Sequence, residues 1–164
     1  MRFQAPVYQT LWNSPLGPML LAANETALLG AWFSDQKHLP DSADWQDAPN
    51  HGVLQQAIHA LTCHFAGRPT AEEVPLDLHA GTEFQQAVWH ALLDIPWGRR
   101  VTYGQLAASV GRPNAVRAVG AAVGRNPVSV LVPCHRVVGA DGSLTGYAGG
   151  LPRKAALLKL EGVL

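Results

Sequence analysis

The chain has 164 residues, 48% of them hydrophobic and 15% charged, which is typical of a globular protein with a sizeable core. No run is long and apolar enough to span a membrane, and the N-terminal residues lack the apolar core of a secretory signal, so we expect a cytoplasmic protein. Twelve basic and twelve acidic residues cancel, but residues 1–78 carry three basic against eight acidic groups, net −5, and residues 79–164 carry nine against four, net +5. The basic half could attract a polyanion, although a solvated basic face explains the charge alone as well.

The first half is expected to form an antiparallel sheet and one helix. Three apolar runs separated by turn residues predict strands at 7–12, 19–23 and 28–33. The polar, acidic residues 35–50 are expected to form a surface loop. A helix is predicted over 53–65 from the stripe Leu54, Ile58, Leu61 and Phe65, and the proline-bearing residues 68–79 are expected to be a linker.

The second half is predicted to be mostly helical. Capping-box patterns at Thr82/Gln85 and Thr102/Gln105 each begin a helix. A third helix from Asn114 to about Gly124 follows the Arg112–Asn114 turn, with Val116, Val119 and Val123 as its inward stripe. A buried strand is expected at 128–132 and a last helix at 153–160.

These elements predict an α+β protein with two domains. Residues 1–78 form an N-terminal supporting domain with a three-stranded antiparallel sheet and a helix. Residues 79–164 form a mainly helical, winged-helix-like domain with a helix-turn-helix.

Two cysteines are candidates for chemistry. Cys63 lies on the helix face opposite the apolar stripe, whereas Cys134 follows a proline and precedes His135 and Arg136. A free cysteine is most often a small buried hydrophobe, but a neighbouring base or positive charge raises the thiolate fraction. Residues adjacent on an extended chain point to opposite sides, so contact between the thiol and His135 needs a turn or a bridging water. No Cys-x-x-Cys motif is present, so no metal is expected.

The motif Pro133-Cys134-His135-Arg136-Val137 resembles the active-site signature of the O6-alkylguanine-DNA alkyltransferases, also called methylated-DNA–protein-cysteine methyltransferases. The resemblance extends in register over about residues 80–164. It includes the blocks at 101–107, 117–120, 125–127, 146–150 and 159–162.

The resemblance implies a chemistry for five residues. Glu161 would orient His135, which would act through a water to deprotonate Cys134. The thiolate would then displace guanine from the alkyl carbon. Tyr103 would donate its hydroxyl toward the leaving guanine, and Asn126 would hold the segment that carries the cysteine. The thioether product cannot be hydrolysed, so each molecule reacts once and needs no cofactor.

The resemblance also implies binding of duplex DNA. The partner would be DNA carrying O6-alkylguanine, bound by a monomer through the minor groove without sequence preference. Arg117 would fill the space left by a flipped-out base. The other expected DNA-contacting residues are Asn114, Ala118, Ala121, Arg125 and Arg136. The expected substrate pocket is lined by Val137, Gly146, Tyr147, Ala148 and Gly149, with Ala148 standing where some relatives have serine.

Two other functions remain open at this stage. A thiol hydrolase using Cys134 and His135 would need an oxyanion hole and would turn over repeatedly, but it gives the helix-turn-helix no role. A non-catalytic DNA-binding module would need no reactive cysteine and would want side chains suited to base edges.

Overall fold

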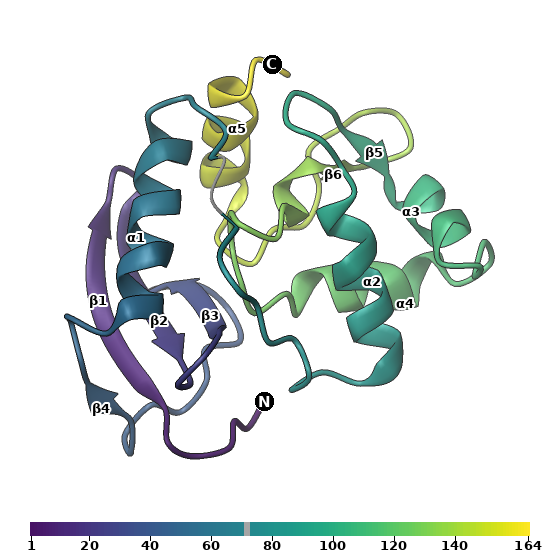
Figure 1. The fold of residues 1–164 in the computed structure, drawn as a ribbon. Helices are drawn as coiled ribbons and strands as arrows, with labels where there is room; N and C mark the ends of the chain where they lie inside the picture. Colours follow the sequence, from purple (N-terminus) through teal and green to yellow (C-terminus); the bar gives the residue numbers. More distant parts are fainter. Residues whose placement is uncertain (71–72) are drawn as a thin grey trace. The chain divides into compact units, whose positions relative to one another are not determined.

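The computed structural model describes residues 1–70 and 73–164 and divides into two compact units. The first comprises residues 1–80 together with 127–131, and the second comprises 81–126 together with 132–164 (Figure 1). Residues 127–131 therefore cluster with the first unit, although the sequence-based division assigns them to the second. The predicted α+β class is confirmed.

The first unit is built on a four-stranded sheet. Its strands are β1 (Tyr8–Ser14), β2 (Gly17–Ala23), β3 (Leu28–Phe33) and β4 (Gln46–Asp47), in the order β3-β2-β1-β4. The first three form the predicted antiparallel meander, and β4 pairs in parallel with β1. The fourth strand was not predicted, because its two exposed residues lie within the acidic segment 35–50 and carry no alternating pattern.

The helix of this unit, α1 (Gly52–Phe65), packs on β1 and β2. The imidazole Nδ1 of His51 accepts the Val53 amide and caps the first turn. Leu54 and Leu61 from the predicted stripe are fully buried. The helix therefore covers the sheet with the face that the sequence indicates.

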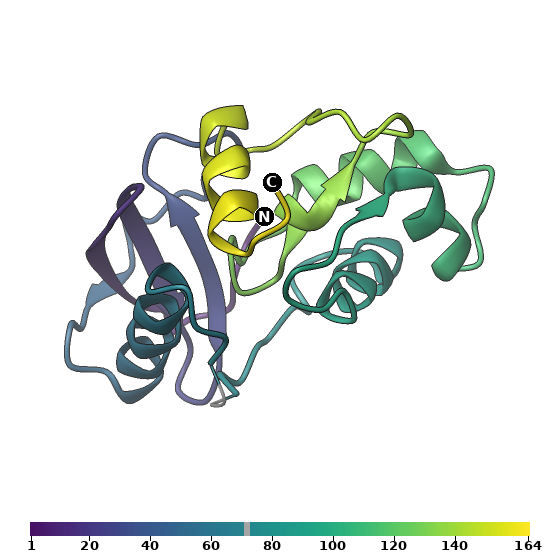
Figure 2. The same cartoon turned by 90° about the horizontal axis from the view of Figure 1, so that it is seen from above.

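The second unit consists of four helices and a short parallel strand pair (Figure 2). The helices are α2 (Glu83–Leu93), α3 (Tyr103–Ser109), α4 (Val116–Gly124) and α5 (Leu151–Leu160), and the strands are β5 (Val101–Thr102) and β6 (Val137–Val138). Both predicted capping boxes form, because Thr82 and Thr102 accept the amides of Gln85 and Gln105 while those side chains accept the cap amides.

Helix α4 packs against both α2 and α3. The indole Nε1 of Trp89 donates to the carbonyl of Ala122 at 2.8 Å, which fixes α2 on α4. The buried face of α4 is Val119, Ala122 and Val123, whereas Val116 is 41% exposed. The prediction that Val116 faces inward is wrong because the helix begins at that residue, one turn before it meets the core.

The buried strand predicted at 128–132 is also wrong. This segment forms one isolated bridge and then turns, because the amide of Leu131 donates to the carbonyl of Ser129 at 3.0 Å around Val130. Val130 has a φ of 74°, which a β-branched residue rarely adopts. A second three-residue turn follows at Pro133, where the Cys134 amide donates to the Val132 carbonyl at 2.8 Å. The apolar run therefore approaches the cysteine as two tight turns.

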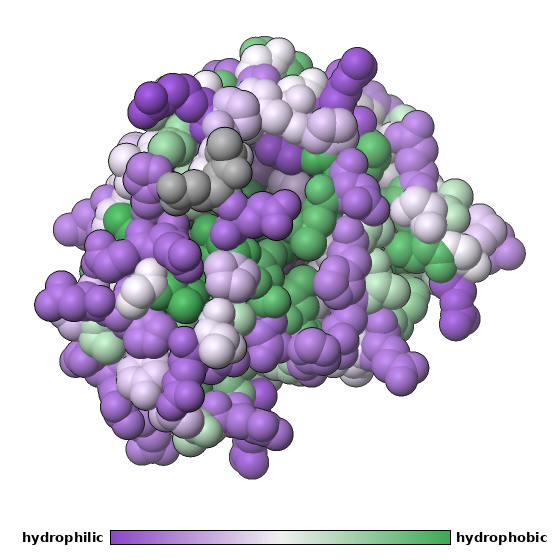
Figure 3. Space-filling view, viewed as in Figure 1, coloured by the Kyte–Doolittle hydropathy of each residue, from purple (hydrophilic) through white to green (hydrophobic). Residues whose placement is uncertain are grey.

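Hydrophilic side chains make up much of the face drawn in Figure 3. Within the part of the chain that the structure describes, no helix combines the length and apolar character needed to cross a bilayer.

Candidate active site

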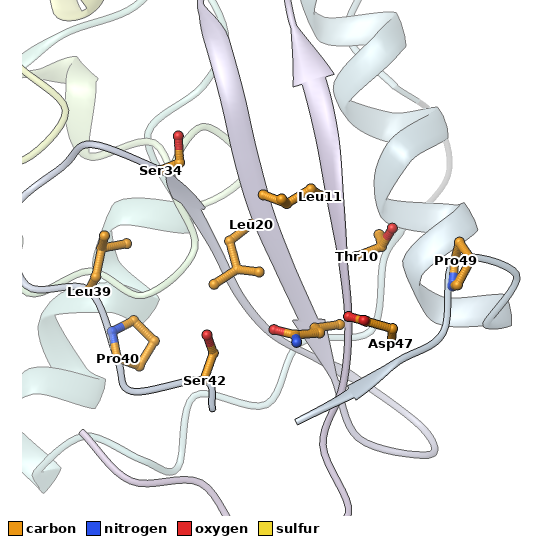
Figure 4. Close-up of a pocket in the computed structure, with 10 residues that line it drawn as sticks. Thr10, Leu11, Leu20, Ser34, Leu39, Pro40, Ser42, Asp47 and Pro49 are labelled. Carbon is orange, nitrogen blue, oxygen red and sulfur yellow. The ribbon is translucent and has the colours of Figure 1, made fainter. Parts of the chain in front are cut away.

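A cavity of about 500 Å³ lies in the first unit (Figure 4). Leu11 and Leu20 come from the sheet, and Leu39 and Pro40 come from the segment that follows β3. Asp47 is its one ionisable side chain among the described residues that line it. The described residues that line this cavity include no thiol or imidazole, so it offers no nucleophile of that kind.

In the second unit, the turn that carries Cys134 is connected through a pair of short strands to helix α3. Cys134–Arg136 forms a single 3-10 turn, η1, which leads directly into β6. Strand β6 pairs in parallel with β5, and β5 runs directly into α3, whose first residue is Tyr103. This pairing brings Tyr103 within electrostatic reach of the Cys134 thiol. Successive side chains of a 3-10 turn diverge by about 120°, so Cys134 and His135 leave the turn in different directions.

Glu161 lies at the C-terminal end of α5 and binds two side chains of this turn. His135 Nε2 lies 2.7 Å from one carboxylate oxygen of Glu161, and Arg136 Nε donates to the other at 2.5 Å. All three residues are buried. A carboxylate at a helix C-terminus opposes the helix dipole, and the Arg136 guanidinium supplies the compensating positive charge.

The structure contradicts the prediction that Arg136 contacts DNA. Its side chain is almost fully buried, and its Nη1 donates to the Ile95 carbonyl at 2.5 Å. With Nε bound to Glu161, the guanidinium is held inside the unit and cannot reach a phosphate. Arg136 instead neutralises the carboxylate that orients His135.

The protonation states of this group follow from burial and charge. Burial lowers the pKa of His135, and the charges of Arg136 and Lys154 lower it further against the opposing effect of Glu161. Burial raises the pKa of Glu161, but hydrogen bonds and charge from His135 and Arg136 outweigh this and hold that pKa below its usual value. At neutral pH a neutral His135 therefore donates Nε2–H to an anionic Glu161. Its Nδ1 then holds the lone pair that can accept a proton.

Cys134 is almost fully buried and is a free thiol, as is the partly exposed Cys63. Burial raises the pKa of Cys134, and this outweighs the lowering by a hydrogen bond from Asn126 and by the charge of Lys154. Burial therefore opposes the higher thiolate fraction that a neighbouring base or positive charge would favour, because a buried site penalises the charged form. The thiol has to lose its proton during the reaction.

Asn126 is buried next to this thiol. Its Nδ2 donates to the Val132 carbonyl at 2.8 Å, and its side chain also hydrogen-bonds Cys134. One amide therefore fixes the backbone before the cysteine and contacts the sulfur itself. The two contacts are those expected of a group that holds the nucleophile in place.

Tyr103 and Lys154 converge on the backbone of a segment that precedes α5. The Tyr103 hydroxyl donates to the carbonyls of Thr145 and Gly146 at 3.0 and 3.4 Å. Lys154 Nζ donates to the same two carbonyls at 2.9 and 3.2 Å and lies 5.8 Å from the centre of the Tyr103 ring. A Cβ on Gly146 would lie in ordinary van der Waals contact with the Tyr103 hydroxyl, at 3.4 Å, so the space alone does not require glycine.

Lys154 is the residue of this site that the sequence reasoning missed. It is fully buried, and burial lowers its pKa to about 8 against the raising effect of Cys134. The signal was present in the helical spacing, because Lys154 precedes the buried Leu157 and Leu158 by three and four residues and so shares their face. A lysine on the apolar face of a helix marks a buried cation.

Substituting Lys154 by methionine is expected to raise the pKa of the Cys134 thiol further, because the neighbouring positive charge is lost. The pH dependence of iodoacetamide labelling at Cys134, measured in a Cys63→Ser background, would report this as a midpoint moved to higher pH. An arginine at position 154 keeps the charge and should give a smaller displacement. An unchanged midpoint in the methionine variant would show that Lys154 does not act on the thiol.

The exposed face of α4 carries the residues expected to meet DNA. Arg117, Ala118 and Ala121 are exposed, and the two alanines have small side chains. Asn114 and Arg125 are also exposed, on either side of the helix. The exposed basic residues of this unit are Arg99, Arg100, Arg112, Arg117, Arg125 and Lys159.

The residues expected to line a substrate pocket occupy two neighbouring segments. Val137 is fully buried in β6. Gly146, Tyr147, Ala148 and Gly149 form the segment before α5, where the Gly150 amide donates to the Tyr147 carbonyl at 2.9 Å. Gly146 has a φ of 58°, a conformation that suits glycine.

Comparison with known proteins identifies the family. The model of the DNA binding domain of 6-O-methylguanine DNA methyltransferase matches residues 83–163, and that of its ribonuclease-like domain matches residues 7–78. The methylated-DNA–protein-cysteine methyltransferase of Mycobacterium leprae is 48% identical over 149 residues, which cover 91% of this chain and 88% of that protein.

Solved structures agree with this. The crystal structure of the Mycobacterium tuberculosis O6-methylguanine methyltransferase has a TM-score of 0.86 and 46% identity, covering 94% of this chain and 92% of that one. The crystal structure of M. tuberculosis OGT in complex with DNA has a TM-score of 0.85 and 44% identity, covering 96% and 92%. The chain therefore belongs to the 6-O-methylguanine DNA methyltransferases, the methylated-DNA–protein-cysteine methyltransferases of DNA repair.

Proposed function

We propose that this chain repairs O6-alkylguanine in duplex DNA by moving the alkyl group onto the sulfur of Cys134. The observation that carries this proposal is the buried cluster in which Glu161 binds His135 beside the one buried thiol of the second unit. Such a carboxylate–imidazole pair is a general means of activating a nucleophile. Family membership supplies the substrate class, and the cluster supplies the residues.

Activation begins with the protonated thiol. Its proton passes through a water to Nδ1 of His135, because the two side chains leave the 3-10 turn in different directions. The imidazolium that forms is stabilised by the anionic Glu161, which already accepts its Nε2–H at 2.7 Å. Lys154 and Asn126 stabilise the new thiolate, since both lower the pKa of Cys134.

Displacement then forms one bond and breaks another. The sulfur attacks the alkyl carbon, a C–S bond forms, and the bond between that carbon and O6 breaks with its electron pair passing to the guanine. The Tyr103 hydroxyl donates a hydrogen bond to the leaving base, after exchanging its present acceptors, the carbonyls of Thr145 and Gly146. The guanine anion takes up a proton from water and remains in the DNA strand as an unmodified base, while the His135 imidazolium returns the thiol proton to solvent.

The thioether product explains why the reaction occurs once. It has no carbonyl for water to attack, so the sulfur is not regenerated and no cofactor takes part. Incubating the protein with excess O6-methylguanine duplex should add one methyl group per molecule, detected by intact-mass analysis. A thiol hydrolase would instead leave the protein mass unchanged and release product repeatedly, so either observation would refute the proposal.

The buried thiol cannot reach a guanine stacked inside a duplex, so the nucleotide must be extruded. We propose that the exposed face of α4 lies in the minor groove, with the small residues Ala118 and Ala121 against the backbone and Arg117 in the vacated stack. Asn114 and Arg125 would bind phosphates at either end of the helix. Binding of this kind is independent of sequence.

Replacing Arg117 with alanine is expected to slow repair of methylated duplex by about tenfold to a hundredfold, because a flipped base costs a few kcal/mol to hold out of the stack. Reaction with free O6-benzylguanine, which needs no extrusion, should be nearly unchanged. Single-turnover rates on both substrates measure the difference. Arg112→Ala, which removes another exposed arginine of the same unit, is the matched control, and equal losses on both substrates would refute the role of Arg117.

Three further assignments complete the proposal. In this proposal residues 79–164 bind DNA and transfer the alkyl group, and residues 1–78 form a supporting domain. A cytoplasmic location suits a protein that works through a free thiol, since a reducing compartment keeps Cys134 from oxidation. We propose that the chain acts as a monomer.

A further inference from the structure

Tyr147 carries a buried hydroxyl that the mechanism above does not use. The residue as a whole is partly exposed, but its hydroxyl oxygen is buried and has no hydrogen-bond partner among the described residues. An unsatisfied buried polar group destabilises the fold, and phenylalanine at this position would avoid that cost. The hydroxyl therefore calls for a partner that is not a side chain or backbone group of the described chain.

The hydroxyl lies within electrostatic reach of the groups that move the proton. Cys134 and Glu161, the two ends of the proton path, both act on it electrostatically, as does Arg153. Burial raises the pKa of the Tyr147 hydroxyl well above its usual value, and the nearby thiol raises it further, so it stays protonated throughout the reaction. It can therefore hold a partner by hydrogen bonding, but it cannot serve as the base.

The proton path contains one polar group that could be the hydrogen-bond partner of this hydroxyl, namely a water molecule. The water between Cys134 and His135 receives the thiol proton and passes a proton to the imidazole. A buried water typically makes about three hydrogen bonds, and these two side chains provide two of them. A third hydrogen-bond partner would hold the water oxygen between the thiol and the imidazole. Metal-bound histidines are oriented in the same way by a hydrogen bond to their second ring nitrogen.

We propose that the Tyr147 hydroxyl is this third partner and positions the relay water between the thiol and His135. The inference rests on the proposed function, because it assumes that Cys134 loses its proton through His135. Tyr147 is a positioning residue in this scheme: it touches the water and forms no bond to the substrate. A backbone hydrogen bond from the Gly150 amide to the Tyr147 carbonyl, at 2.9 Å, holds the main chain of this residue immediately before α5.

The test is Tyr147→Phe in the full-length protein, with single-turnover methyl transfer measured from pH 6 to pH 10. Near neutral pH the variant should react about tenfold more slowly, since the water is less well placed. The loss should shrink as the pH rises and the thiol ionises without the relay. The charged and titratable groups around the path, Arg136, Lys154, Arg153, Glu161 and Tyr103, are unchanged in the variant, so the changed profile reports the water.

Two control variants separate this role from others. Tyr8→Phe, in the first unit, should keep the wild-type rate at every pH. Tyr103→Phe should lose rate by a similar factor at all pH values, because its hydroxyl serves the leaving base. The Tyr147 variant should also bind DNA with wild-type affinity and melt at the same or a higher temperature.

Three outcomes would overturn the inference. A wild-type pH–rate profile in Tyr147→Phe would show that the hydroxyl has no role in transfer. A loss of rate independent of pH would show that the hydroxyl acts on the guanine base. A lower melting temperature with a proportional loss of activity would show a structural role. In each case wild-type protein that still gains one methyl on Cys134 leaves the proposed function standing. Wild-type protein that gains none refutes the proposed function directly.

Discussion

Replacing Cys134 with serine is expected to abolish methyl transfer, lowering the single-turnover rate by more than about a thousandfold. A serine hydroxyl is a far weaker nucleophile than a thiol, and His135 cannot ionise it appreciably at neutral pH. The variant should remain folded, because the substitution changes one buried atom and keeps the contact with Asn126 possible. Intact-mass analysis after incubation with O6-methylguanine duplex measures the result.

Cys63→Ser is the matched control for this experiment. Cys63 is partly exposed on α1, 3.8 Å from His59 Nε2, and belongs to the first unit. The control should react at the wild-type rate and gain one methyl group, which peptide mapping should place on Cys134. A methyl group found on Cys63 in the wild-type protein, with Cys134 unmodified, would contradict the assignment.

Replacing Glu161 with glutamine is expected to reduce both stability and transfer rate. Among the described residues, this carboxylate is the one acidic partner of the buried Arg136 guanidinium, and removing one member of a buried ion pair costs about 3–5 kcal/mol. Transfer should slow because the neutral amide no longer stabilises the His135 imidazolium. Urea unfolding and single-turnover kinetics measure the two effects, and DNA affinity at a temperature where the variant is folded should be nearly unchanged.

The pH dependence of stability gives a second readout of the same group. The folded-state pKa of Glu161 is lowered, so its stabilising contribution is present above its unfolded value of about 4.3 and is lost as the pH falls through the folded value. The folded-state pKa of His135 is also lowered, so stability is lost as the pH falls below its unfolded value of about 6.5. The melting temperature of the wild type should therefore drop from pH 7 toward pH 4.

Glu161→Gln should lose the part of this acid dependence that lies below about pH 4.3, because the titrating carboxylate is gone. Glu25→Gln, at an exposed turn, is the matched control and should alter neither stability nor rate. A Glu161 variant with wild-type stability and wild-type transfer would remove this residue from both the fold and the mechanism.

Local sequence signals were sufficient for most secondary structure. The two capping boxes depend on residues three apart, and the apolar stripe on α1 depends on residues one turn apart. The interactions that form these helices can therefore be recognised within a few consecutive residues. The segment 128–132 shows the limit of this approach. Four apolar residues among these five predict a strand, yet the positive φ of Val130 cannot be inferred from a β-branched side chain.

The sequence by itself determined the α+β class, most helices and, through a motif of adjacent residues, the candidate nucleophile and its family. Only the tertiary structure decided what surrounds that nucleophile. It withdrew Arg136 from the DNA-contacting set, revealed Lys154 as a buried cation and showed a thiol that burial keeps protonated. The physical reason is that burial and electrostatic interaction depend on groups brought together from distant parts of the chain, such as Cys134 and Glu161, whereas capping and helical periodicity depend on near neighbours.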